Sequence, residues 1–252
     1  MTGESRAVKS KDEIDLIRRS SRIVAETLRL LESAIRPGIT TKELDEIAET
    51  HIRSRGGMPS FKGYRGFPAS ICASINSEVV HGIPGQRALM EGDIISIDVG
   101  VFKEGYHGDG AATFPVGKIG TDAARLLDTT KASLVAGIAE ARDGATISDV
   151  SRAIQNVVEG AGFSVVRDLV GHGIGREMHE EPQVPNFVTH GASPPLLRGM
   201  TLAVEPMVSA GGYEITVKAD AWTVVTKDGS LSAHFEHTIA VAEDGGEMLT
   251  VC

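Results

Sequence analysis

The 252-residue chain carries 25 lysines and arginines against 34 aspartates and glutamates, which gives a formal net charge of −9. This acidic balance argues against nucleic acid or an anionic membrane as the main partner. Hydrophobic residues make up 41% of the chain and charged residues 23%, a composition that excludes a disordered protein and suffices for a sizeable core.

Signals for membrane insertion and export are missing from the sequence. No apolar run reaches the roughly 18 residues of a membrane span. The polar residues 1–15 contain no apolar core of a signal peptide. Two cysteines, Cys72 and Cys252, exclude a disulfide framework and favour a reducing compartment. We therefore expect a protein of the cytoplasm.

Four helices are predicted from capping residues and apolar spacing. Ser10 begins the first with a glutamate three residues later, and the helix ends before Pro37. Thr40 begins the second in the same way, and two more helices are expected near 122–141 and 147–159. Strand patterns occur at 70–75, 94–101, 106–114, 165–170, 201–208, 214–225 and 232–241. The chain is therefore expected to be an α+β protein.

The helix-then-strand order occurs twice, and one strand motif is repeated. Residues 92–98 and 199–205 both begin with a turn glycine, continue with a strand pattern of alternating side chains, and end with an acidic residue at the seventh position. We expect a single domain over 1–252 made of two related halves, about 8–117 and 118–252, whose acidic strands face a shared centre.

Acidic side chains in the first half are predicted to lie close together. Alternation along the strand places Asp98 on the face opposite to the apolar residues. A hairpin turn centred on Lys103 and Glu104 would put Asp98 directly opposite Asp109, whereas a bulge at Gly105 would shift the register by one. Two carboxylates about 5 Å apart need a cation or a shared proton.

The second half of the chain adds a histidine and a glutamate as candidate metal ligands. His172 lies among glycines at 171–175, and Glu205 repeats the position of Asp98. Carboxylates with an imidazole suit Mn²⁺, Fe²⁺, Co²⁺ or Zn²⁺, and a thiolate site is excluded because cysteines are too few. Four other histidines are interpreted as structural or exposed: His51, His107, His190 and His237.

Seven short motifs occur in a fixed order: HGIP at 81–84, IDVG at 97–100, GD at 108–109, GHGIG at 171–175, HEEP at 179–182, VEP at 204–206 and EHT at 236–238. This set resembles the type I methionine aminopeptidases, in their bacterial form without an N-terminal extension, within the pita-bread metallopeptidase family. The likeness runs from about residue 8 to the end of the chain.

The resemblance implies a pita-bread fold, with two pseudo-symmetric halves and a curved antiparallel sheet around a central site for two divalent ions (Co, Mn, Fe, Zn or Ni). The implied metal ligands are Asp98, Asp109, His172, Glu205 and Glu236. Glu205 would also carry a proton to the leaving amine, His179 would stabilise the oxyanion, and His81 would contact the scissile amide nitrogen.

The resemblance also implies the substrate. The methionine pocket would be walled by Tyr64, Phe67, Cys72 and Trp222. Phe61 and Met178 depart from the family pattern, and they affect pocket shape and inhibitor preference while keeping an apolar wall. The expected substrate is a new polypeptide with a free N-terminal methionine and a small second residue. A monomer is expected, and a transient contact with the ribosome is left open.

Three alternatives remain at this stage. A proline-specific peptidase shares the fold but carries a further N-terminal domain. A peptide-binding relative would have lost metal ligands that are all present here. A dinuclear phosphatase or oxygenase could use the same residue types on another fold.

Overall fold

The computed structural model describes residues 7–191 and 193–252, so the first part of the polar stretch 1–15 lies outside the described residues. Four helices of eight residues or more lie within this described part: α2 (Lys11–Ala34), α3 (Thr41–Ser54), α4 (Thr121–Glu140) and α5 (Ile147–Gly160). Ser10 and Thr40 each accept a hydrogen bond from the backbone of a glutamate three residues later, whose side chain bonds back. The structure therefore confirms both predicted capping boxes.

The strands form four sheets, and every strand pairing in the described ranges is antiparallel. The first contains β1 (Met58–Pro59), β2 (Cys72–Ile75), β4 (Ile94–Lys103) and β5 (Tyr106–Pro115). The second contains β6 (Ser164–Val165), β10 (Met207–Ser209) and β13 (Ser232–His234). The third contains β3 (Glu78–Val80), β11 (Ile215–Val217) and β12 (Val224–Thr226). The fourth contains β7 (Gly171–Gly173), β8 (Glu180–Val184), β9 (Thr201–Val204), β14 (His237–Val241) and β15 (Gly246–Met248).

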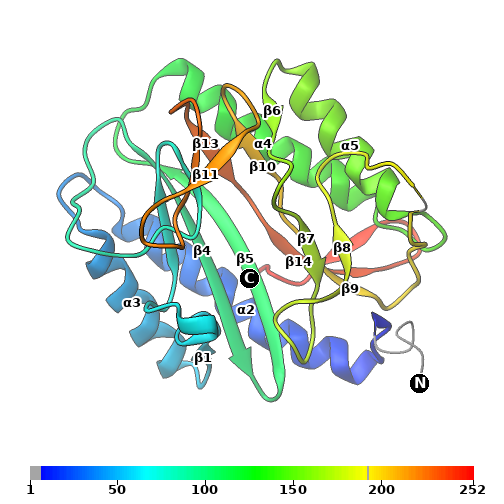
Figure 1. Ribbon diagram of the computed structural model, residues 1–252. Coiled ribbons are helices and arrows are strands. Elements are labelled where there is room, and N and C mark those ends of the chain that lie inside the picture. Colours follow the sequence, from blue (N-terminus) through cyan, green and yellow to red (C-terminus); the bar gives the residue numbers. More distant parts are fainter. Residues whose placement is uncertain (1–6, 192) are drawn as a thin grey trace.

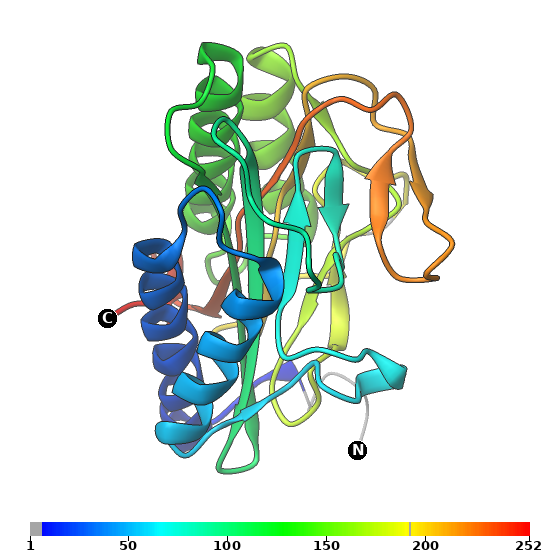
Figure 2. The same ribbon diagram turned by 90° about the vertical axis from the view of Figure 1, so that its left-hand side faces the viewer.

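The helices cover one side of the strands. Figure 2 shows α2 to α5 on that side, and the β2–β3 and β11–β12 segments on the other (Figures 1 and 2). Ile95, Ile97 and Val99 of β4 are fully buried in the core beneath α2 and α3. A second core joins α4 and α5 to β9, β13 and β14. The α+β class is confirmed, and the strand face away from the helices is left for polar side chains.

Three of the predicted long strands are interrupted. The pattern at 214–225 splits into β11 and β12, with residues 218–223 between them. The pattern at 201–208 splits into β9 and β10 around Glu205 and Pro206, because proline has no N–H for the strand ladder. The pattern at 232–241 splits into β13 and β14 around Phe235 and Glu236. Both glutamates therefore lie at strand breaks, and the expectation that Glu205 lies within a strand is wrong.

The predicted register of the β4–β5 hairpin is also wrong. Asp98 lies opposite Ala111, and Asp109 lies opposite Gly100. The turn consists of Glu104 and Gly105, both with positive φ, which places its centre one residue later than predicted. A shift of the centre by one residue moves each partner by two, so both aspartates keep the same face as diagonal neighbours.

Gly108 sets how closely α2 approaches β5. A methyl group added there would lie 2.5 Å from the backbone nitrogen of Ser21. The Ser20 hydroxyl also donates a 2.9 Å hydrogen bond to the Tyr106 carbonyl at the same crossing. The helix backbone thus lies directly against the strand that carries Asp109.

The substitution Gly108→Ala should destabilise the protein by about 1–3 kcal/mol, because a buried backbone has to move. For a chain of this size, each kcal/mol of lost stability lowers the melting temperature by roughly 2–4 °C, so thermal unfolding measures the effect. Gly160→Ala is the control, since its added methyl group meets nothing within 4 Å at the end of α5. Equal melting temperatures for the two variants would contradict this packing.

Candidate metal centre and pocket

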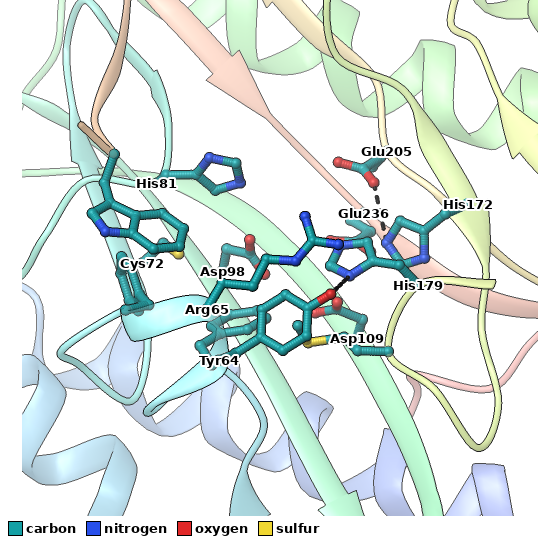
Figure 3. Close-up of a pocket in the computed structure, with 14 residues that line it drawn as sticks. Tyr64, Arg65, Cys72, His81, Asp98, Asp109, His172, His179, Glu205 and Glu236 are labelled. Carbon is teal, nitrogen blue, oxygen red and sulfur yellow. Dashed lines mark hydrogen bonds and ion pairs between the residues drawn. The ribbon is translucent and has the colours of Figure 1, made fainter. Parts of the chain in front are cut away.

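One cavity of about 160 Å³ borders every site residue predicted from the sequence (Figure 3). Its lining residues are Phe61, Tyr64, Arg65, Phe67, Cys72, His81, Asp98, Asp109, His172, Met178, His179, Glu205, Trp222 and Glu236. Glu205, Glu236 and His172 lie at one end of the cavity, and Cys72 lies at the opposite end (Figure 3). The fold therefore brings a polar cluster and an apolar wall into a single space.

The β4–β5 hairpin supplies Asp98 and Asp109. Asp109 is only 4% exposed, and its backbone is held on both sides by Thr238. The Thr238 hydroxyl accepts from the Asp109 N–H at 2.9 Å and donates to the Asp109 carbonyl at 2.7 Å. This contact fixes β5 to β14, which begins directly after Glu236.

The two glutamates enter from the strand breaks. The Glu205 carbonyl accepts a 3.0 Å hydrogen bond from Asn186 Nδ2, which holds the turn after β9. The Glu236 N–H donates to the Ala111 carbonyl at 2.9 Å, which holds its turn above β5. Because neither glutamate lies in a regular ladder, each carboxylate is free to point into the cavity.

His172 comes from the middle of the three-residue strand β7. Its Nδ1 lies 2.9 Å from the Gly173 carbonyl, which can only accept, so Nδ1 carries the proton. Nε2 therefore presents a lone pair, and it lies 3.5 Å from Glu205 Oε1. Methyl groups added at Gly171 or Gly173 would lie 2.4 and 2.3 Å from carbonyl oxygens, so these glycines admit neighbouring strands rather than a ligand.

Burial strongly disfavours the ionised form of these acids. It raises the pKa of Asp98 and of Glu205 to about 7. Burial, and then the neighbouring carboxylates, raise the pKa of Asp109 and of Glu236 well above their usual range. Four carboxylates so close together cannot all be ionised without positive charge between them.

The donor set fits divalent cations. Two groups bring their ligand atoms within 4.8 Å of one another: Asp109, His172 and Glu236, and Glu205, His234 and Glu236. Asp98 Oδ1 and Glu236 Oε1 are buried without a hydrogen-bond partner. Carboxylate oxygens with imidazole nitrogens suit Mn²⁺, Fe²⁺, Co²⁺ or Zn²⁺. Glu236 belongs to both groups.

His179 and His81 are neutral at physiological pH. Burial, with a smaller effect of His172, lowers the pKa of His179 to about 3, and burial lowers that of His81 to about 4. The Tyr64 hydroxyl lies 3.0 Å from His179 Nδ1, and the two rings stack at 5.4 Å. When the hydroxyl donates, His179 carries its proton on Nε2.

The apolar wall forms a small core of its own. Phe67 meets Trp222 edge to face at 5.1 Å, and Cys72 is 4% exposed beside them. Phe61 and Met178, the two departures from the family pattern, are buried in the same cluster. A free thiol and a thioether in this wall leave it uncharged and adaptable.

Sequence reasoning missed two residues near the cavity. Arg65 lies at its mouth in a left-handed conformation, with its guanidinium 5.3 Å from the centre of the Tyr64 ring. His234 is buried behind Glu205, with Nε2 at 3.5 Å from Glu205 Oε2. In a strand, side chains two residues apart share a face, so the spacing from Glu236 could have indicated that His234 lies near the site. The position of β13 behind Glu205, however, depends on long-range packing.

Comparisons with known proteins agree with this geometry. The methionine aminopeptidase of Clostridium acetobutylicum is 52% identical to this chain, over 97% of the chain and 98% of that protein. Methionine aminopeptidase 1 of Bacillus subtilis is 53% identical over 96% of the chain and 98% of that protein. The crystal structure of methionine aminopeptidase from Rickettsia prowazekii superposes with a TM-score of 0.94 at 40% identity, and covers 97% of this chain and 99% of that one.

Residues 15–243 match the metallopeptidase family M24, and this range includes the whole candidate metal centre. The pita-bread fold implied by the sequence is confirmed by its structural neighbours. The chain therefore belongs to metallopeptidase family M24.

Proposed function

We propose that this chain is a methionine aminopeptidase, which hydrolyses the first peptide bond of chains that begin with methionine and a small second residue. The observation that carries the proposal is the union of a carboxylate–imidazole cluster and an apolar wall in one small cavity. Its similarity to methionine aminopeptidases over nearly the full length supports the same substrate class. Membership of a peptidase family argues against the phosphatase and oxygenase alternatives.

Two divalent ions would be held by Asp98, Asp109, His172, Glu205 and Glu236. The lone pair on His172 Nε2, the unpartnered carboxylate oxygens and the raised pKa values all support this role. When bound, such ions polarise a carbonyl group and lower the pKa of a water molecule.

Glu205 is the proposed proton carrier. Its carboxylate borders the cavity, with Oε1 3.5 Å from His172 Nε2. A group of this kind can accept a proton from water and return it to the leaving amine.

His179 and His81 are the proposed hydrogen-bonding residues for the reacting amide. With the Tyr64 hydroxyl donating to Nδ1, His179 carries its proton on Nε2, and this nitrogen can donate to a developing oxyanion. His81 is neutral, so that it can accept from the scissile amide N–H. The wall formed by Tyr64, Phe67, Cys72 and Trp222 would take the methionine side chain.

Several expectations stay predictions. These are the single domain over 1–252 with its two related halves, the monomeric state, the cytoplasmic location and a transient contact with the ribosome. No helix in the described part of the chain is long and apolar enough to cross a membrane.

Glu205→Gln should lower kcat for a Met-Ala-Ser peptide by roughly 10²–10⁴-fold, because the amide cannot accept the proton. Release of free methionine measures this, and calorimetric titration with Mn²⁺ shows whether metal binding has also changed. Glu243→Gln, at an exposed glutamate, is the control. Turnover at the unmodified rate in the Glu205 variant would remove the proposed role.

The substrate limit predicts that Met-Ala-Ser and Met-Gly-Ser are cleaved with a kcat/KM about 10–200-fold above that of Met-Leu-Ser, since a few methylenes in a tight site have such effects. A phosphomonoester assayed beside them should not be hydrolysed. If Met-Leu-Ser were cleaved as well as Met-Ala-Ser, the requirement for a small second residue would be wrong.

Removal of metal should make stability depend on pH. The pKa values of Asp98 and Glu205 are about 7 in the folded chain, against 3.8 and 4.5 for the free groups. The folded metal-free protein then binds more protons than the unfolded chain between pH 4 and 7. Its free energy of unfolding should therefore fall as pH rises through this window.

Thermal unfolding with and without Mn²⁺ at pH 5.5 and pH 8 measures the effect. The rise in melting temperature on adding Mn²⁺ should be larger at pH 8, where the carboxylates are ionised. The metal-free Asp109→Asn variant, with one carboxylate fewer, should depend less on pH. An equal rise at both values would contradict the charge argument.

A further inference from the structure

His234 occupies a fixed position behind the candidate metal centre. It is the last residue of β13 and is 1% exposed. The Thr113 hydroxyl of β5 accepts from the His234 N–H at 2.9 Å and donates to its carbonyl at 2.8 Å. The backbone of His234 is thereby held against β5, and its side chain does not line the cavity.

The imidazole has a buried nitrogen that no hydrogen bond satisfies. His234 Nε2 is inaccessible to solvent and has no partner within hydrogen-bonding geometry. Glu205 Oε2 lies 3.5 Å from this nitrogen. A buried polar nitrogen left unpaired is destabilising, so a hydrogen-bond partner is expected at this position.

Glu205 lies between two imidazoles, one facing each oxygen. His172 Nε2 lies 3.5 Å from Oε1, and His234 Nε2 lies 3.5 Å from Oε2. His172 carries its proton on Nδ1, where the Gly173 carbonyl accepts it, so its Nε2 cannot donate to Oε1. The two sides of Glu205 therefore differ: a lone pair faces Oε1, and His234 can present an N–H to Oε2.

We propose that His234 is a positioning residue for Glu205, whose Oε2 accepts a hydrogen bond from His234 Nε2–H in the working enzyme. This inference rests on the proposed function. The present 3.5 Å separation exceeds the usual 2.7–3.2 Å, and hydrogen bonds at catalytic sites tighten when the substrate is in place. Oε1 then remains for the metal, and the carboxylate cannot rotate away from the cavity.

Another arrangement uses the same atoms. Glu205, His234 and Glu236 bring their ligand atoms within 4.8 Å, so His234 could itself ligate an ion. A donor to Glu205 can be replaced by an amide N–H, whereas replacing an imidazole ligand exchanges a nitrogen for an amide oxygen and alters the Co²⁺ absorption bands. His234→Gln therefore separates the two roles.

The test compares His234→Gln, which keeps a donor, with His234→Leu and His234→Met, which keep the bulk without one. Their kcat and KM on Met-Ala-Ser are measured together with the Kd for Mn²⁺ and the melting temperature. His107→Leu is the control, since this histidine lies outside the cavity and bonds Ser60 Oγ at 2.9 Å. It should change the melting temperature but not kcat.

The Leu and Met variants should lose about 10–100-fold in kcat or in Mn²⁺ affinity, with KM within about twofold. The Gln variant should stay within about threefold of the unmodified enzyme, and its Co²⁺-loaded form should keep the unmodified absorption bands. Two results would overturn the proposal. In the first, the folded Gln variant loses as much kcat or Mn²⁺ affinity as the Leu variant, or its Co²⁺ absorption bands shift. In the second, the Leu variant keeps full activity and full metal affinity.

Failure of the proposed function would look different. In that case the unmodified chain releases no methionine from any peptide, whereas the Mn²⁺ affinities of the His234 variants still report whether Glu205 depends on this contact.

Discussion

The structure depends on one electrostatic constraint: four carboxylates from separate segments share a buried space. Burial raises the pKa of every one of them, and two of their oxygens have no hydrogen-bond partner in the described residues. Such a cluster opposes folding unless protons or cations neutralise it. Protons would leave the acids unable to bind metal or to move protons, so divalent cations are the solution consistent with a hydrolase.

The scaffold meets this constraint by keeping its apolar cores elsewhere. Helices α2 to α5 bury one face of the strands, and this burial provides the favourable free energy that the polar face cannot. The acids then enter from a regular hairpin and from two strand breaks. Threonine hydroxyls on β5 and β14 fix the backbone beside Asp109 and His234. Hydrogen bonds within the protein therefore hold the backbone at these two positions.

The helices could be predicted from sequence because their signals are local, and the short motifs contain residues that the structure brings to one cavity. Capping boxes, apolar spacing and short motifs each depend on a few neighbouring residues, and Asp98 is on the expected face of β4. The register of β4 and β5 was missed because Glu104 adopts the left-handed conformation that moves the turn by one residue. The short strands β1, β3, β7, β8 and β15 were also missed, since strands of two to five residues carry little sequence pattern.

The contact between His234 and Glu205 could not be found in the same way. It joins β13 to the break after β9, and no spacing in the sequence indicates which strand lies behind which. Anomalous diffraction from a crystal soaked in Mn²⁺ shows directly whether cations neutralise the four carboxylates. We expect two manganese peaks surrounded by Asp98, Asp109, His172, Glu205 and Glu236. Carboxylates that turn away from one another, with no manganese between them at saturating concentration, would contradict it.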